Sequence, residues 1–460
     1  MKKAFSLIIA ILMAISLFAC SGGTTATTAS SSSSSSGSPA SSESQPASLE
    51  SSQQTVSEEP ALTGVEAIDT IGADGIDWNH LSTDELYEMA KAEGGVIKIY
   101  STTADGNTAK KKIARDYPDL EFEYVSCDTD TIKGKIELEN STGNVNADLM
   151  LVKDSSGEIY NDLVVPGIVS VYYPARICES IDRDMLAYGL PLYATFNPWF
   201  YNTRDFPDGC PITSWWDIVE GYNPDTKSYT NAAGVNTQKW TIYTKDIKAP
   251  SYAALWAQLI IDGDLMREQY EKQYGEPLEI TYTDKLQNSG FKYFPEDNAG
   301  VELFWRFTQM QSTELDGGDS VVNAVHESLN GPTLGLCSAS KIDNSKQVMG
   351  DNGMDIAWVT GLSPYTTQNA ASYLYVVEGC DNPAGARLFI NYMLGGDDGE
   401  SGCYHTFDKL GHWSVRSDVE FAESGIPLES VGLKAPDFEQ IYDYYLSIQS
   451  YWSLWTGWRK

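Results

Sequence analysis

Strand-like and helix-like patterns alternate between residues 82 and 152, and this alternation constrains the possible folds more than any other feature of the sequence. Residues 96–100 have the composition of a buried strand, 108–116 that of a helix, and 120–125 alternate apolar and acidic side chains as a second strand. Another helix follows, and residues 147–152 form a third predicted strand. This order predicts an α/β fold with a largely parallel sheet.

Two helix boundaries are marked by local signals. Ser82 and Glu85 have the spacing of a capping box, and Gly94 should end the helix that they begin. Near the other end of the chain, Asn382 is a candidate cap and Pro383 suits a first helical position. Apolar residues at helical spacing follow Pro383, so this segment is predicted to be a helix that packs on the core.

The loops after the first and third predicted strands are candidates for a binding site. In parallel sheets, ligands bind beyond the carboxyl ends of the strands, so both loops should lie on one rim. The polar candidates on these loops are Ser101, Thr102, Thr103, Asp154 and Ser155.

The N-terminus has the pattern of an export signal. Lys2 and Lys3 precede an apolar run over residues 4–18, which is too short to span a bilayer, and Ala19 then precedes Cys20. The segment resembles bacterial lipoprotein signals, which implies a signal peptide at 1–19, cleavage before Cys20 and lipid attached to Cys20. A plain secretory signal with an incidental cysteine is the alternative.

Residues 20–61 are predicted to be a disordered stalk behind the lipidated cysteine. Ser, Thr, Ala, Gly, Gln and Glu dominate the segment after Cys20, which contains no aromatic residue. Such a segment buries too little apolar surface to offset the entropy of ordering. The remaining chain, residues 62–460, exceeds the length at which single cores usually stop growing, so we expect two lobes.

Composition excludes several classes of function. The formal net charge is −33 at pH 7, which argues against a nucleic-acid partner. The four histidines lack HExxH spacing, and the chain has neither a GxSxG elbow nor a Walker loop. An abundance of Asp and Glu leaves a surface-anchored hydrolase such as a glycosidase as an alternative.

Six cysteines follow Cys20, and none has the spacing of a zinc site. An even number outside the cell permits disulfides, with Cys380 and Cys403 as the first pair to test, while unpaired buried thiols remain the other interpretation. The six are Cys127, Cys178, Cys210, Cys337, Cys380 and Cys403.

Several segments together resemble the extracellular solute-binding proteins of ABC transporters. They are most similar to the branch that binds ferric iron, thiamine and phosphonates, although Ser414 stands where many relatives have proline. The segments occur in the family's order at 92–101, 199–202, 211–217, 361–365, 382–394 and 411–416.

The resemblance implies a two-lobe α/β fold of the type II periplasmic-binding-protein class, with crossing hinge strands. Lobe 1 would comprise residues 62–193 and 375–412, and lobe 2 residues 194–374. Residues 413–460 would form C-terminal helices that pack on the lobes.

Further candidate ligand contacts lie on the first crossover and in lobe 2. The resemblance places Tyr193, Phe196 and Trp199 on the crossover, although some of these aromatics must belong to the core. Ser251 precedes an apolar helix and is either an anion contact or simply a helix cap. The other lobe 2 candidates are Tyr252, Ser338, Ser363 and Tyr365.

The function implied is capture of a small organic solute by a monomeric, membrane-anchored protein that delivers it to an ABC permease. Closure of the lobes on the solute would be a population shift, and no cofactor is expected. Ferric iron is an alternative, but neither Tyr172 and Tyr173 nor Tyr444 and Tyr445 match the tyrosine pair of iron-binding relatives. The candidates for the solute are a phosphonate or phosphate ester, a thiamine-like cation and a sugar.

Overall fold

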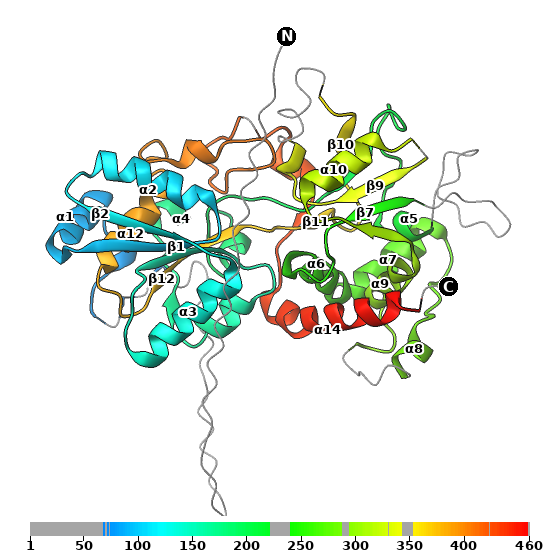
Figure 1. Cartoon of the computed structure of the whole chain (residues 1–460), viewed down its shortest axis with the longest axis horizontal. Helices are drawn as coiled ribbons and strands as arrows, with labels where there is room; N and C mark the ends of the chain where they lie inside the picture. The colour runs from blue at the N-terminus through cyan, green and yellow to red at the C-terminus, as the bar shows by residue number, and fades with distance from the viewer. Residues whose placement is uncertain are drawn as a thin grey trace, which may run out of the picture. The chain divides into compact units, whose positions relative to one another are not determined.

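The protein is known from a computed structural model. It describes residues 68, 69, 71, 72 and 74–458, apart from gaps at 221–239, 288–293, 330, 343–352 and 423. Cys20 and the predicted stalk lie outside the described residues. The described chain forms two α/β lobes, each built on its own sheet (Figure 1).

The lobe 1 sheet has the strand order β2-β1-β3-β12-β4, and β5 also pairs with β12. β1 is parallel to both β2 and β3, as the sequence predicted, whereas β12 returns antiparallel to β3. The strands are β1 (Val96–Ser101), β2 (Glu121–Ser126), β3 (Leu149–Lys153), β4 (Val169–Ser170), β5 (Leu190–Pro191) and β12 (Ser372–Val377).

Helices cover both faces of this sheet because its strands are apolar on both sides. Ile97 and Ile99 of β1 pack with one group of helices, while Tyr100 packs with Ile132 and Ile136 of α3 on the opposite face. The first group is α1 (Thr83–Glu93), α2 (Ala104–Asp116) and α12 (Pro383–Met393); α3 is Thr129–Thr142. Shorter elements of this lobe are η2 (Trp78–His80), η3 (Tyr160–Val164), α4 (Ala175–Cys178) and η4 (Arg183–Leu186).

Helix caps agree with the sequence at one end of the chain and differ at the other. The capping box of Ser82 and Glu85 is present, and Gly94 ends α1 with a φ of 69°. Asn382 occupies the N-cap position of α12 and Pro383 its first position, as predicted, but the Asn382 side chain donates to Asp148 and makes no capping hydrogen bond. Glu93 caps α12 instead, since its carboxylate accepts from the Ala384 and Gly385 amides at 2.8 and 3.1 Å.

The lobe 2 sheet has the order β10-β6-β9-β7-β8. β7 is parallel to both β8 and β9, and β6 is antiparallel to β9 and β10. Its strands are β6 (Trp199–Asn202), β7 (Thr241–Thr244), β8 (Ser312–Glu314), β9 (Thr333–Leu336) and β10 (Ile356–Trp358).

A dense aromatic core joins this sheet to its helices. Trp256 of α6 packs on Phe307 of α9, with ring centroids 4.6 Å apart, and Trp199 packs on the same phenylalanine. α14, the long red helix in Figure 1, lies along α6 and α9. The helices are α5 (Trp215–Glu220), α6 (Pro250–Ile261), α7 (Gly263–Tyr274), α8 (Thr283–Gln287), α9 (Ala299–Gln309), α10 (Gly318–Glu327) and α14 (Phe438–Thr456).

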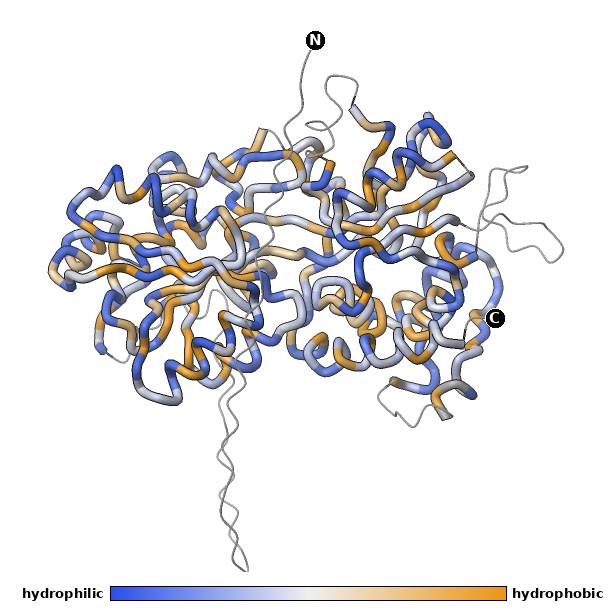
Figure 2. The backbone as a smooth tube through the Cα atoms, in the orientation of Figure 1, coloured by the Kyte–Doolittle hydropathy of each residue, from blue (hydrophilic) through white to orange (hydrophobic). Residues whose placement is uncertain are grey.

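The chain passes between the sheets twice, as the hinge prediction required. Residues 192–198 lead from β5 to β6, and residues 359–371 return from β10 to β12. Hydrophobic residues occur along the strands of both lobes, as the orange segments of the backbone tube in Figure 2 show. η6 (Tyr404–Phe407) and α13 (Leu428–Val431) lie beside the crossings. β11 (Thr367–Gln368), on the second crossing, pairs in parallel with β13 (Leu433–Lys434), after which the chain continues to α14 on lobe 2.

All six cysteines after Cys20 are described, and each is a free thiol, Cys380 and Cys403 included. Among the helices that the structure describes, none combines the length and the apolar character needed to cross a membrane.

Candidate ligand-binding cleft

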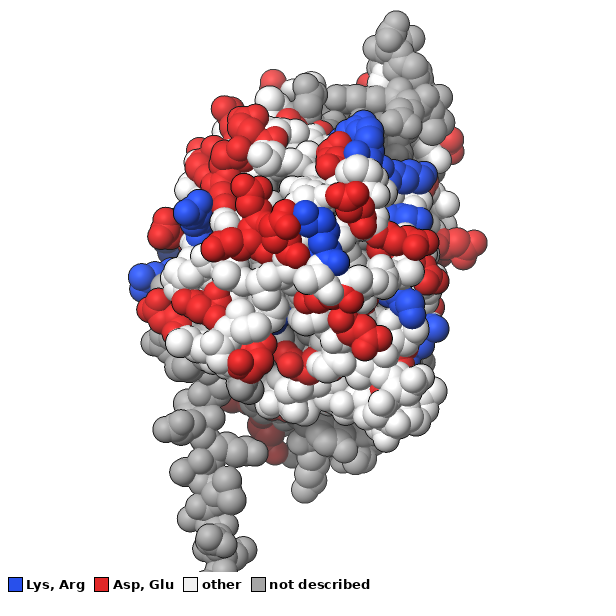
Figure 3. All heavy atoms as spheres, turned by 90° about the vertical axis from the view of Figure 1, so that its left-hand side faces the viewer, with Lys and Arg blue, Asp and Glu red and all other residues white. Residues whose placement is uncertain are grey.

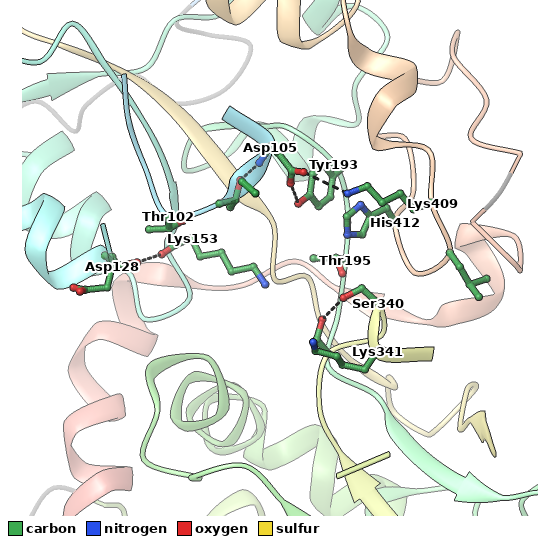
Figure 4. A pocket seen from close by; sticks show the side chains of 15 residues that line it. Thr102, Asp105, Asp128, Lys153, Tyr193, Thr195, Ser340, Lys341, Lys409 and His412 are labelled. Atoms are coloured by element: carbon green, nitrogen blue, oxygen red, sulfur yellow. Dashed lines mark hydrogen bonds and ion pairs between the residues drawn. The ribbon is translucent and has the colours of Figure 1, made fainter. Parts of the chain in front are cut away.

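A cleft of about 930 Å³ lies between the lobes, beside the first crossover (Figure 4). This volume suits a small organic molecule. The residues that line it come from the strand ends of lobe 1, the crossover, lobe 2 and the segment after η6. They are Thr102, Thr103, Ala104, Asp105, Asp128, Thr129, Lys153, Tyr193, Thr195, Ser338, Ser340, Lys341, Lys409, Leu410 and His412.

Two helix starts form the lobe 1 wall. Thr103 caps α2, since its Oγ1 accepts from the Asp105 amide at 3.1 Å, and Asp128 caps α3 by accepting from the Thr131 amide at 2.8 Å. Both helices begin where a strand of the sheet ends. Their first amides carry partial positive charge, so this wall favours an anionic group.

The Thr102 hydroxyl, on the same wall, is free to donate a hydrogen bond to a ligand. Its Oγ1 is buried and has no hydrogen-bond partner among the described residues. A buried hydroxyl without a partner costs free energy, so a ligand that bonds to it gains that amount. Ser101 lies beneath it, fully buried, and bonds to Thr103.

Tyr193 and His412 form the hinge side of the cleft. Their rings are stacked with centroids 4.0 Å apart and an interplanar angle of 14°. The Tyr193 hydroxyl donates to Asp105 at 2.9 Å, and the Lys409 ammonium donates to the same carboxylate at 3.4 Å. Burial and the nearby Lys409 charge lower the pKa of His412 to about 4, so this imidazole is neutral at pH 7.

Lobe 2 contributes Ser338, Ser340 and Lys341, which follow β9. The two serine hydroxyls are 3.1 Å apart, and the Lys341 ammonium donates to Asp319 of α10 at 3.1 Å. Hydroxyl groups therefore face the lobe 1 helix starts across the cleft.

Three lysines line the cleft, and Lys153 is the one whose side-chain ammonium has no hydrogen bond or ion pair to a described residue. It ends β3 and its side chain extends into the cleft (Figure 4). Burial, together with repulsion from Lys245, lowers its pKa. Among the charged side chains on the outer face of lobe 1, by contrast, Asp and Glu predominate over Lys and Arg (Figure 3). The cleft thus concentrates positive charge in an acidic protein.

Four of the residues predicted from sequence line the cleft: Thr102, Thr103, Tyr193 and Ser338. Three came from loops at strand ends, and Tyr193 from the crossover.

Asp154 and Ser155 are buried instead of facing the cleft. The Asp154 side chain is 3% exposed and accepts from the Tyr160 amide at 2.8 Å, which places it inside lobe 1. β3 ends at Lys153, whose side chain lines the cleft, and the next residue, Asp154, turns inward to the Tyr160 amide.

The remaining candidates also lie elsewhere. Phe196, Trp199, Tyr252 and Tyr365 are buried in the lobe cores. The Ser363 amide donates to the Thr213 carbonyl, outside the cleft. Ser251 is not a cap, since α6 begins at Pro250 with Ala249 before it and has no side-chain cap.

Sequence reasoning missed the charged half of the cleft. Lys153 directly precedes the candidate Asp154, Ser340 lies two residues after the candidate Ser338, and His412 lies in a segment that carries the family resemblance. No local signal marks Lys409, Asp105 or Asp128 as cleft residues.

No group of three or more His, Cys, Asp or Glu side chains in the described part of the chain is arranged to hold an ion.

Comparisons with known proteins find similarity only at the level of structure. No protein-family model matches the chain, and no curated protein sequence matches it. Iron-bound HitA from Pseudomonas aeruginosa matches with a TM-score of 0.52 at 12% identity, covering 77% of this chain and 98% of that one. Apo ferric ion-binding protein A from Pasteurella haemolytica matches with 0.53 at 13% identity, covering 79% and 98%.

A third similar structure is the periplasmic binding protein AfuA from Actinobacillus pleuropneumoniae, with exogenous fructose-6-phosphate bound. Its TM-score is 0.50 at 16% identity, and the match covers 79% of this chain and all 100% of AfuA. Likeness at such low identity establishes the fold: the chain has the two-lobe architecture of periplasmic binding proteins, as the sequence predicted.

Proposed function

We propose that this protein is the membrane-anchored extracellular solute-binding component of an ABC importer, and that its solute is a small organic anion. The observation that carries the proposal is the interlobe cleft, where Lys153, Lys341 and Lys409 meet two helix starts. A phosphate, phosphonate or carboxylate group would accept from these donors.

The hydrogen bonds and ion pairs that the cleft carboxylates already make favour an anionic solute over a cationic one. Asp105 already accepts from Tyr193 and Lys409, and Asp128 caps α3. Lys153, by contrast, has no side-chain partner among the described residues, and the two carboxylates are too few for ferric iron, which requires several anionic oxygens. HitA is iron-bound and the Pasteurella haemolytica protein is a ferric ion-binding protein, but the described residues of this chain include no cluster of three or more side chains that could hold an ion.

The same contacts support binding without turnover. His412 is stacked on Tyr193 and neutral, and its Nδ1 lies 3.3 Å from the Phe407 carbonyl oxygen. The Asp105 carboxylate is held by two donors. These groups are arranged to fix the cleft wall, whereas a general acid or base needs a free position next to the reacting bond.

Solute capture would proceed by a shift between open and closed populations. The two crossings allow one lobe to rotate against the other, and a solute that touches both walls binds more tightly when they close. A permease would then recognise the closed form. Lipid on Cys20 would hold the protein near that permease through the Ser-rich stalk.

A thermal-shift panel tests the proposal. Fructose 6-phosphate, inorganic phosphate and citrate represent anions, and glucose, thiamine and ferric iron represent the alternatives. A solute at about 100 times its Kd stabilises by about 2.7 kcal/mol, which raises Tm by several degrees. We expect shifts from one or more anions only. A shift from thiamine, glucose or iron with none from the anions would overturn the proposal.

A further inference from the structure

Lys245 is a lobe 2 lysine whose positive charge acts on Lys153 of lobe 1. It directly follows β7, and the parallel register pairs Thr244 with Leu336 of β9. Lys245 is therefore level with Cys337, one residue before Ser338, which lines the cleft. Lys153 and Lys245 thus occupy equivalent places in the two lobes, each at the carboxyl end of a parallel strand. Lys153 lines the cleft, and Lys245 lies behind the Ser338 wall.

The two ammonium groups repel each other electrostatically, and neither forms an ion pair with a described residue. Lys245 is a cause of the lowered pKa of Lys153, and Asp105 opposes that effect. No ion pair or side-chain hydrogen bond to a described residue is found for either lysine. The carboxylate next to Lys245, Asp246, lies 3.8 Å from the Lys248 ammonium instead.

Like charges that face each other across a hinge have a definite consequence. Moving the lobes together brings both ammonium groups into a narrower space with less water, which strengthens their repulsion. An anion between them reverses the sign of the interaction, because each lysine then gains a partner.

We propose that Lys153 and Lys245 form a two-sided clamp on the anionic group of the solute, and that their repulsion disfavours closure without it. This inference rests on the proposed function and deepens it, since it assigns a lobe 2 ligand contact and a charge requirement. The clamp suits a group with two negative charges, such as a phosphate monoester, better than a group with one. Hydroxyls of Thr102 and Ser338 would bind the rest of its oxygens.

Calorimetric titration with inorganic phosphate and fructose 6-phosphate tests the clamp. The proteins are the wild type, K153Q, K245Q, the double variant and K248Q. Lys248 is the control, because it follows the same strand but is not among the charges that shift the pKa of Lys153. We expect each single variant to weaken binding at least tenfold. The double variant should be little weaker than the worse single one, because a clamp needs both sides. K248Q should bind within twofold of the wild type.

Wild-type affinity in K245Q would overturn the clamp while leaving the proposed function intact. Failure of the wild type to bind either anion, with binding of a neutral or cationic solute, would contradict the proposed function itself.

Small-angle X-ray scattering of the ligand-free proteins tests, without any solute, whether repulsion between Lys153 and Lys245 keeps the lobes apart. Raising NaCl from 0.05 to 1 M shortens the Debye length to about 3 Å and screens the pair. The wild-type radius of gyration should fall with salt, and the double variant should be more compact at low salt and respond less. Equal radii of the two proteins at every salt concentration would refute the repulsion.

Discussion

Asp154 illustrates how a single buried carboxyl group affects this fold. Its Oδ2 accepts from the Tyr160 amide, while its Oδ1 is buried with no partner among the described residues. Burial raises the pKa of Asp154 to about 7, since only part of the lost hydration is replaced by backbone donors. The charged form is therefore destabilising in the folded protein.

The folded pKa of Asp154 lies above the unfolded value, so its contribution to stability declines as pH rises from about 4 to about 7 and is constant above that. D154N removes this titration while keeping an acceptor for Tyr160. The free energy of unfolding of D154N relative to wild type should increase by roughly 1–4 kcal/mol between pH 4 and pH 8. Urea unfolding at both pH values measures it.

D208N is the matched control, because Asp208 is an exposed turn residue. Its difference from wild type should stay within about 0.5 kcal/mol. A pH-independent difference for D154N would show that Asp154 does not titrate in this range.

At the residue scale, the sequence predicts positions on strand ends well and side-chain direction poorly. Thr102 and Thr103 were predicted correctly as cleft residues, because the order of strands and helices is enough to place the loops after parallel strands on one edge of the sheet. Lys153 and Asp154 are neighbours on that same rim, and a shift of one residue moves a side chain from the cleft to the core. Trp199 and Phe196 were candidates by position, but their large apolar rings are buried in the cores.

Gly300 shows how closely two helices of lobe 2 approach each other. It lies in the first turn of α9, and a Cβ there would stand 2.0 Å from the Leu259 carbonyl oxygen of α6. The absence of a side chain thus permits the contact that brings Trp256 against Phe307.

G300A should lower the free energy of unfolding by about 3 kcal/mol, because the helices must separate to admit the methyl group. G134A is the control: Gly134 lies on an exposed part of α3, with open space around its Cβ position. G134A should instead stabilise by about 0.5–1 kcal/mol through helix propensity. Urea titrations followed by tryptophan fluorescence compare the two. A loss in G300A no larger than 0.5 kcal/mol would mean that α6 and α9 are loosely packed.

At the element scale, local signals predict where helices begin only when the cap is itself local. Ser82 and Glu85 are three residues apart, and their capping box is present as predicted. The cap of α12 is Glu93, 291 positions before Ala384, and no pattern around Asn382 reveals it. The start of α2 is four residues earlier than predicted because Thr103 caps it and the polar first turn lacked an apolar signal.

At the scale of the whole molecule, two crossings and two sheets create the cleft. The alternation of strands and helices predicts the lobe 1 sheet, whereas the second lobe was predicted from the chain length and from the resemblance to solute-binding proteins. The identity of the cleft residues could not be predicted from the sequence, because Lys409 and His412 reach the cleft from a segment beyond the second crossing.

Native mass spectrometry of the gently purified protein, followed by release and identification of the bound molecule, tests the central claim most directly. The account predicts one small organic solute per chain that carries a phosphate, phosphonate or carboxylate group and is recovered chemically unchanged after incubation. A ferric ion, a cationic or neutral solute, or a solute converted to product would contradict it.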